Sequence, residues 1–175
     1  LVSTDKGKLS AWNMAAGTAE GMVSAPRWTQ AAHTARINDI AVVRDQGRAA
    51  TAGDDGSVRI WNLQDGTLLA ALLPVTPTLL TDVAWGPNGS LVAAIGPDGL
   101  VHLWDVASST ELPPLAAGAA AVQARGTGAA AGPPNFTSLA FSVDGRRLAA
   151  ARDDGSISIW DLARRSVDST PPTGR

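Results

Sequence analysis

The chain of 175 residues contains no cysteine and no tyrosine, and only two histidines. The absence of cysteine excludes disulfides, thiolate nucleophiles and zinc sites with cysteine ligands, while His33 and His102 alone leave few ligands for another metal. The charge is nearly balanced, at 14 basic against 16 acidic side chains, and no apolar run reaches the ~18 residues that span a bilayer. We therefore expect no metal, no cofactor, no nucleic acid and no membrane as a ligand or partner.

Large side chains are also scarce. The chain has 18 glycines, 11 prolines and 32 alanines, against six tryptophans and two phenylalanines. Since small residues bury little apolar surface, the tryptophans must supply much of the bulk in the core.

A repeat is the strongest pattern in the sequence. Three segments of 20 residues align without a gap, namely 37–56, 80–99 and 136–155. Each continues as a short alternating strand that ends in Trp61, Trp104 or Trp160, followed by Asp or Asn, and the start of the chain repeats the second half of this unit with Trp12. A fixed period of this size indicates a repeat architecture.

Within each unit the pattern is that of β-strands. In the first complete unit the apolar run 39–43 is followed by turn residues at 45–47 and by the small-residue strand 49–52. The other units follow the same order, and the alanine-rich second strands indicate close packing on both faces. The alanine-rich stretch 116–131 lacks the apolar stripe of an amphipathic helix.

The recurring Asp-Asp-Gly at 54–56 and 153–155, each followed by a strand ending in Trp-Asn or Trp-Asp, resembles the WD-repeat (WD40) family of β-propellers. The resemblance implies an all-β fold in which four antiparallel strands form one blade. The chain would supply about 3.5 to 4 blades of a seven-bladed ring, with a four-bladed ring as the alternative. Because a propeller closes only when its last blade meets its first, we expect a fragment of a longer polypeptide.

The repeat also predicts where the blades begin and end. The expected units are an incomplete first blade at 1–32, a second at 33–76, a third at 77–116, a low-complexity insertion at 117–134 and a fourth blade at 135–175. The whole proline-bracketed stretch 113–135 is predicted to be disordered. Trp28 is assigned to the outer strand of the first blade, and 165–172 to a poor outer strand of the last.

In the WD-repeat family a buried hydrogen-bonded set stabilises a blade. The resemblance assigns this role in the second unit to His33, Thr51, Asp55 and Trp61. Such a set satisfies several buried polar groups at once, so His33 is interpreted as structural rather than as a catalytic base.

The other units keep only part of this set. The third keeps Asp98 and Trp104 and the fourth keeps Asp154 and Trp160, but both have alanine in place of the hydroxyl residue and lack the histidine. The first unit has Lys6 at the turn position of the aspartate. His102 lies two residues before a tryptophan and is expected to be a partly exposed strand residue.

The family's partner contacts concentrate on the face that carries the turn before the tryptophan strand. Carried over position by position, the predicted protein-binding residues are Arg36, Asn38, Asp54, Leu79, Thr81, Pro97, Asn135, Thr137 and Asp153. Arg36, Asp54 and Asp153 are the preferred polar contacts among them.

No reactive constellation accompanies these motifs. The sequence has no Gly-x-Ser-x-Gly elbow and no lysine-bearing phosphate loop, and its paired aspartates recur at one turn position. The leading hypothesis is therefore a non-catalytic, intracellular scaffold, cytoplasmic or nuclear, whose partners are other proteins or peptides and the missing blades of the same chain.

Two alternatives stay open, the propeller portion of a larger enzyme and a ubiquitin-ligase substrate receptor. Absence of tyrosine argues against the sialidase-like propeller enzymes, whose nucleophile is a tyrosine. The receptor signature, an arginine three residues after each repeat tryptophan, is missing, because those positions hold Ala15, Gln64, Ala107 and Ala163.

Overall fold

The computed structural model describes residues 2–3, 6–12, 25–43, 46–116, 135–164 and 166–167. This part of the chain contains no α-helix and forms four antiparallel sheets, which we call blades 1 to 4 in chain order. As predicted from the repeat, blade 1 has three strands and each later blade has four.

Each blade is a meander in which consecutive strands are hydrogen-bonded neighbours. Blade 1 consists of β1 (Val2–Ser3), β2 (Lys8–Ala11) and β3 (Trp28–Ala31). Blade 2 consists of β4 (Ile37–Val43), β5 (Arg48–Gly53), β6 (Val58–Asn62) and β7 (Leu68–Leu72). Blade 3 consists of β8 (Asp82–Trp85), β9 (Leu91–Ile95), β10 (Leu100–Asp105) and β11 (Thr110–Ala116). Blade 4 consists of β12 (Phe136–Phe141), β13 (Arg147–Arg152), β14 (Ile157–Asp161) and β15 (Ser166–Val167).

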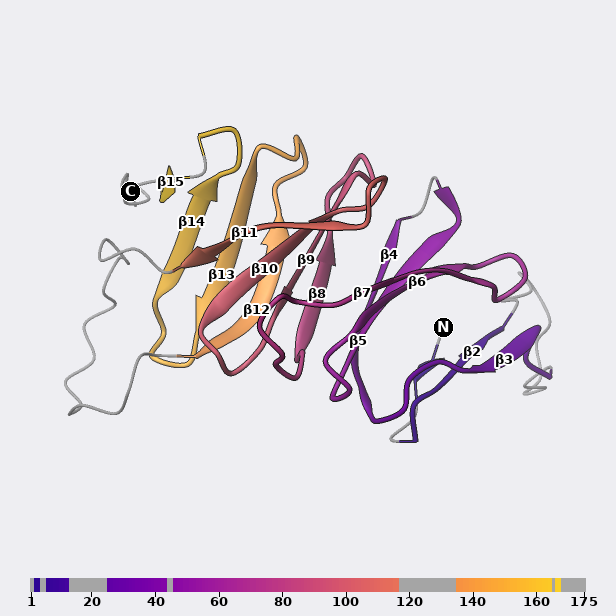
Figure 1. Cartoon of the computed structure of the whole chain (residues 1–175). Helices are drawn as coiled ribbons and strands as arrows, with labels where there is room; N and C mark the ends of the chain where they lie inside the picture. The colour runs from indigo at the N-terminus through magenta and orange to yellow at the C-terminus, as the bar shows by residue number, and fades with distance from the viewer. Residues whose placement is uncertain are drawn as a thin grey trace, which may run out of the picture.

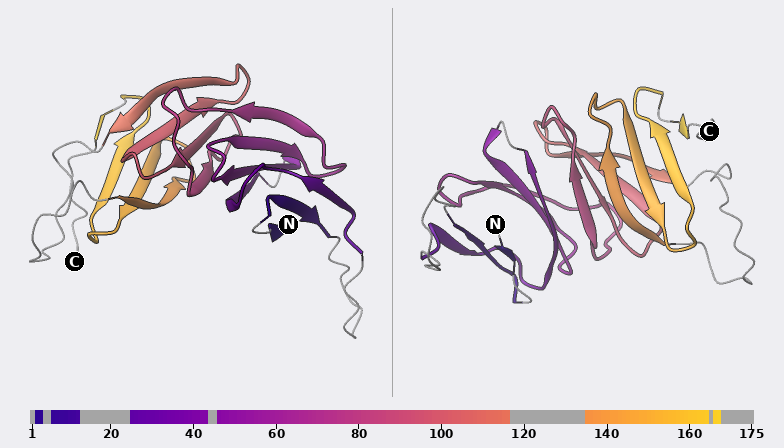
Figure 2. Two further views of the ribbon diagram at one scale, coloured as in Figure 1. Left: turned by 60° about the horizontal axis from the view of Figure 1, so that its bottom comes forward. Right: turned by 180° about the vertical axis from the view of Figure 1, so that it is seen from behind.

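The blades are arranged as an open arc (Figure 1). The inner strand β4 packs against β8, and β8 packs against β12, so blades 2, 3 and 4 follow one another in chain order. Blades 1 and 4 lie at opposite ends of the arc, as the second view shows (Figure 2).

Small side chains allow the blades to approach closely. On β5 the residues Ala49, Ala50 and Ala52 are fully buried, and Ala93 and Ala94 occupy the corresponding part of β9. Larger apolar side chains of neighbouring blades fill the space on either side and form continuous cores between blades 2 and 3 and between blades 3 and 4. The core therefore lies between the sheets, as expected when repeats stack.

The structure tests the predictions for the low-complexity stretch and for the outer strands of blades 1 and 4. The prediction of disorder across 113–135 is wrong at its start, because residues 113–116 belong to β11, which pairs with β10. Residues 117–134 lie outside the described residues. Trp28 lies in β3 as predicted, and the outer strand expected at 165–172 is described only as β15.

Two inner-strand aspartates connect successive blades. Asp39 of β4 accepts a hydrogen bond from the backbone N–H of Val83 at 3.1 Å, and Asp82 of β8 accepts one from Leu139 of β12 at 2.6 Å. Burial raises the pKa of Asp82 to about 6, and the neighbouring carboxyl of Asp39 contributes to the rise although the Leu139 amide opposes it. Asp82 therefore keeps its proton to a higher pH than an exposed aspartate does.

We expect the variant Asp82→Asn to gain stability relative to the unchanged protein as the pH rises from about 5 to about 8. The pKa of Asp82 is raised above its ordinary value of 3.8, so its stabilising contribution is complete below that value and is lost as the pH rises through about 6. Asparagine offers the Leu139 amide an oxygen and Asp39 an N–H donor at every pH. Urea unfolding at both pH values measures the difference.

The matched control is Asp144→Asn. The hydrogen bond from Ser142 lowers the pKa of Asp144, so this exposed carboxyl is ionised at both pH values and its substitution should have a constant effect. A constant effect of Asp82→Asn as well would show that the pKa of Asp82 is not raised.

Candidate protein-binding face and the polar sets beneath it

The candidate face is built where the turn of one blade meets the starts of two inner strands. In blade 2 the N–H of Asp54 donates to the carbonyl of Arg36 at 2.9 Å. The N–H of Leu80, at the entrance to blade 3, donates to the carbonyl of Gly53 at 3.2 Å. These bonds bring the predicted residues Arg36, Asp54 and Leu79 to one region of the surface, although they come from two blades.

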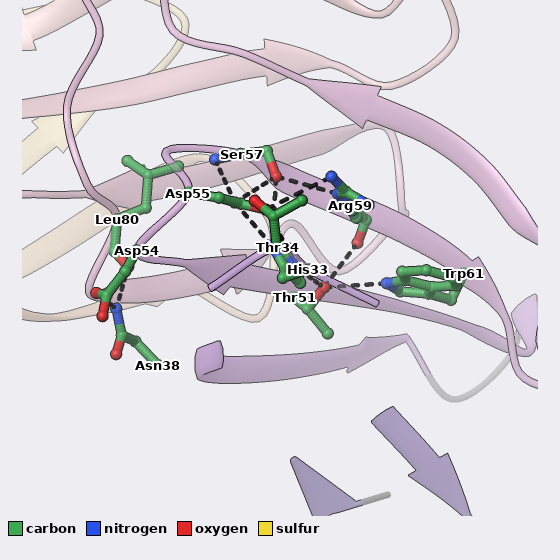
Figure 3. Close-up of polar contacts among 10 residues, drawn as sticks. All are labelled: His33, Thr34, Asn38, Thr51, Asp54, Asp55, Ser57, Arg59, Trp61 and Leu80. Carbon is green, nitrogen blue, oxygen red and sulfur yellow. Dashed lines mark hydrogen bonds and ion pairs between the residues drawn. The ribbon is translucent and has the colours of Figure 1, made fainter. Parts of the chain in front are cut away.

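Asn38 joins the two blades at this point (Figure 3). Its side-chain amide donates to the carboxylate of Asp54 at 2.6 Å and to the carbonyl of Leu80 at 2.8 Å. Asn38 is half-buried and uses its donors inside the protein, whereas Asp54 is exposed. The structure thus places Asn38 as a support for the Asp54 carboxylate.

Blade 4 repeats this arrangement with an asparagine at a different position. The backbone N–H of Asn135 donates to Asp153 Oδ1 at 3.1 Å, and its side-chain amide donates to Oδ2 at 3.3 Å. The N–H of Asp153 donates back to the carbonyl of Asn135 at 3.1 Å. Both residues are exposed, and their mutual bonds fix the Asp153 carboxylate at the surface.

The remaining predicted face residues are exposed. Thr81 and Thr137 lie near the starts of blades 3 and 4, and Pro97 lies in the turn between β9 and β10. Thr81 is held by its N–H and its hydroxyl, which both donate to the carbonyl of Ile95, at 2.8 and 3.2 Å. The face therefore presents three groups, one at the junction of blades 2 and 3, one on blade 3 and one on blade 4.

Beneath the face, the four side chains predicted in blade 2 form one hydrogen-bonded chain (Figure 3). His33 Nδ1 lies 2.9 Å from Asp55 Oδ1, and His33 Nε2 lies 2.6 Å from the hydroxyl of Thr51. Trp61 Nε1 donates to the same hydroxyl at 3.0 Å. Because Asp55 accepts from Nδ1–H and the hydroxyl donates to Nε2, the neutral Nδ1–H tautomer satisfies every group.

The electrostatics of this set favour a neutral histidine beside an ionised aspartate. Burial lowers the pKa of His33, against the opposing effect of Asp55. Burial alone would raise the pKa of Asp55, but hydrogen bonds from His33, Ser57 and the Thr34 amide outweigh it and hold the pKa well below its usual range. With both ring nitrogens of His33 engaged, the set stabilises the blade.

In blade 3 a different histidine, His102, forms the buried polar set. The expectation that His102 is partly exposed is wrong, because its side chain is 1% exposed and its Nε2 lies 2.8 Å from Asp98 Oδ2. Its Nδ1 lies 2.6 Å from Glu111 Oε1 on β11, and its ring stacks on Trp104 at 5.9 Å. A histidine on the third strand thus occupies the role left open by the missing loop histidine.

The tryptophans of blades 3 and 4 find acceptors in the preceding blade. Position 94 is alanine and offers no hydroxyl, and Trp104 Nε1 instead donates to the carbonyl of Leu73 at 3.4 Å. Trp160 Nε1 donates in the same way to the carbonyl of Ala116 at 3.2 Å. Loss of the hydroxyl therefore converts a bond within a blade into a bond between blades.

In blade 4 an arginine replaces a glycine next to the turn. In blade 2 a Cβ on Gly53 would come within 2.8 Å of the His33 ring, so only glycine fits there. At the equivalent position of blade 4 the buried Arg152 places its guanidinium over the ring of Phe136 at 4.9 Å. Asp154 keeps only its local role, accepting the N–H of Ser156 at 2.8 Å.

Two features are absent from the described residues. Within them, no three histidine, aspartate or glutamate side chains gather in a group that would hold a metal ion. This part of the chain also has no helix long and apolar enough to cross a membrane. What the face does offer is exposed carboxylates and apolar side chains on a backbone fixed by hydrogen bonds.

Antiparallel four-stranded blades that pack side by side around their inner strands are the units of a β-propeller. The family model described as WD40, WD domain, G-beta repeat, matches residues 24–62, 75–105 and 130–161, and each match ends on the tryptophan strand of a blade. The chain therefore belongs to the WD40 repeat family.

Curated relatives include two plant proteins and a fungal one. The chain is 32% identical over 143 residues to the small ribosomal subunit protein RACK1 of Brassica napus and 31% identical over 142 residues to RACK1z of Arabidopsis thaliana, in each case over 79% of this chain and 43% of the relative. It is 28% identical over 130 residues to the cross-pathway control WD-repeat protein 2 of Flammulina velutipes, over 74% of this chain and 39% of the relative. The chain thus spans less than half the length of these relatives.

Removal of the Asp55 carboxylate should destabilise the protein strongly. In Asp55→Ala the buried His33 loses its acceptor and Ser57 and Thr34 lose theirs, at about 1–3 kcal/mol for each unsatisfied buried group. Asp154→Ala is the matched control, and with Lys6→Ala it should have a much smaller effect on the free energy of unfolding in urea. Equal losses would contradict a complete polar set in blade 2 alone.

His102→Ala should also be costly, because the carboxylates of Asp98 and Glu111 both lose their bond to the imidazole and each keeps only a backbone N–H donor. We expect a loss of about 3 kcal/mol in the free energy of unfolding. Ser158→Ala changes the equivalent position in blade 4 and serves as the control. A similar small loss for both variants would show that His102 contributes only packing.

Proposed function

We propose that this protein is a non-catalytic scaffold that binds other proteins through the face described above. The observation that carries the proposal is the fixed backbone of that face, where one bond within blade 2 and one between blades 2 and 3 hold Arg36, Asp54 and Leu79 together. Surface groups that are already ordered lose little conformational entropy on binding, which favours recognition of a partner.

The chemistry of the described residues supports binding over catalysis. The two histidines are buried in hydrogen-bonded sets, and the paired aspartates at 54–55 and 153–154 act as turn residues. A role as the propeller portion of a larger enzyme is compatible with the same surface. A ubiquitin-ligase receptor is less favoured, because Gln64 and Ala107 occupy positions where that signature needs arginine.

The relatives support the same proposal at a coarser level. Two of them are named as small ribosomal subunit proteins, that is, as components of a large assembly. We propose an intracellular location for this protein by analogy with them. We also propose that its blades belong to a seven-bladed ring, which agrees with the 43% share of each plant relative that the chain covers.

The test compares two variants in which an exposed arginine is replaced by glutamate, one at each end of the strands. Arg36→Glu changes the proposed face, and Arg146→Glu makes the same change at an exposed hairpin at the other end of the strands. We expect proteins that co-purify with the unchanged protein to fall about tenfold with Arg36→Glu and to stay constant with Arg146→Glu. Quantitative mass spectrometry measures both, and loss of the same proteins with Arg146→Glu alone would contradict the proposal.

A further inference from the structure

One segment of the protein concentrates exposed apolar side chains. Of the eight large hydrophobic residues that are exposed in the described part of the chain, five lie between positions 68 and 79, namely Leu68, Leu69, Leu73, Val75 and Leu79. Leu73 is 65% exposed and Val75 is 86% exposed. The segment 68–80 contains no charged residue. Exposed apolar side chains that gather on one segment are typical of an interaction site.

The part of this segment that links blades 2 and 3, residues 73–79, is fixed by its backbone. The carbonyl of Leu73 accepts from Trp104, and the N–H of Val75 donates to Glu111 Oε2. At the other end Leu80 bonds to Gly53, and the backbone of Thr78 lies against Gly56. The polar backbone groups thus face the blades while the apolar side chains face solvent. We call residues 73–79 the apolar ridge.

A groove lies on each side of the ridge. One has a volume of about 500 Å³ and is lined by Leu73, Pro77 and Leu79 together with Asp54. The other has a volume of about 330 Å³ and is lined by Val75 of the ridge with apolar residues and Glu111 of blade 3. Grooves of this size accept single side chains of a bound segment.

The charged side chains that line the two grooves are carboxylates. The titratable side chains that line them are those of Asp54 and Asp55 in the first and of His102 and Glu111 in the second, and none of the described lining residues is lysine or arginine. Asp55 is engaged with His33, and Glu111 with His102, so the exposed Asp54 is the carboxylate available to a ligand. The surface therefore combines an apolar ridge with one exposed carboxylate, that of Asp54.

We propose that the apolar ridge binds an extended segment of a partner protein in which apolar side chains alternate with lysine or arginine. The apolar side chains would fill the grooves beside Leu73 and Val75, and a basic side chain would pair with Asp54. This inference rests on the proposed function and specifies the partner. A second copy of the chain fits less well, because its ridge offers no lysine or arginine to pair with Asp54.

The experiment uses three labelled peptides and fluorescence anisotropy. The probe is Gly-Ser-Leu-Arg-Leu-Lys-Leu-Ser-Gly, with one matched peptide that has serine for each leucine and another that has glutamate for arginine and lysine. We expect the probe to bind at least tenfold more tightly than either matched peptide, and its affinity to fall with added salt.

Variants then locate the site. The double variant Leu73→Ser/Val75→Ser and the single variant Asp54→Asn should weaken probe binding about tenfold and about threefold. Val143→Ser and Asp144→Asn, both exposed on blade 4, should leave it unchanged. All five altered residues are exposed at the surface, so we expect the variants to fold normally, which circular dichroism checks.

Three outcomes would overturn the proposal. These are equal binding of the serine peptide, tighter binding of the glutamate peptide, or equal effects of the ridge and control variants. Concentration-dependent dimerisation in sedimentation that Leu73→Ser/Val75→Ser abolishes would instead assign the ridge to self-association. If the probe fails while Arg36→Glu still releases co-purifying proteins, the proposed function stands and only the ridge assignment falls.

Discussion

The buried indole N–H of each repeat tryptophan is the constraint on which the arrangement of the blades depends. Packing one blade on the next removes these groups from water, so each needs an acceptor inside the protein. Trp61 finds it on its own blade, because Thr51 supplies a hydroxyl. Trp104 has Ala94 at the corresponding position and reaches back to the Leu73 carbonyl. A hydroxyl on the second strand therefore decides whether the indole N–H is bonded within its own blade or to the preceding part of the chain.

The same constraint shapes the surface. By accepting from Trp104, the carbonyl of Leu73 fixes the start of the linker between blades 2 and 3, and Glu111 fixes Val75 two residues later. Glu111 is itself held by His102. The polar network of the blade 3 core thus extends into the backbone of the linker, where the side chains of Leu73 and Val75 are exposed.

Much of the fold was predictable because its signals are local. The Asp-Gly turn and the tryptophan strand recur within a few residues of one another, so their spacing identified the repeat units. The resemblance to the WD-repeat family then assigned the polar set of blade 2. The environment of His102 was not predictable. Its partner Glu111 lies on the neighbouring strand β11, and the sequence pattern does not show which residues of β10 and β11 lie side by side. The strand at 113–116 was missed because Pro113 and Pro114 suggest a loop. An edge strand tolerates proline, because the backbone N–H that proline lacks is not needed on the side without a neighbouring strand.

The inner-strand aspartates give the array a direction. Asp39 accepts the amide of Val83 in the following blade, and Asp82 accepts that of Leu139 in the blade after, so the carboxylate always precedes its donor in the chain. In a chain made from its N-terminus, the acceptor of each of these two bonds is therefore synthesised before its donor. Blade 4 carries Ser138 at the position of Asp39 and Asp82, so its inner strand offers a hydroxyl there in place of a carboxylate.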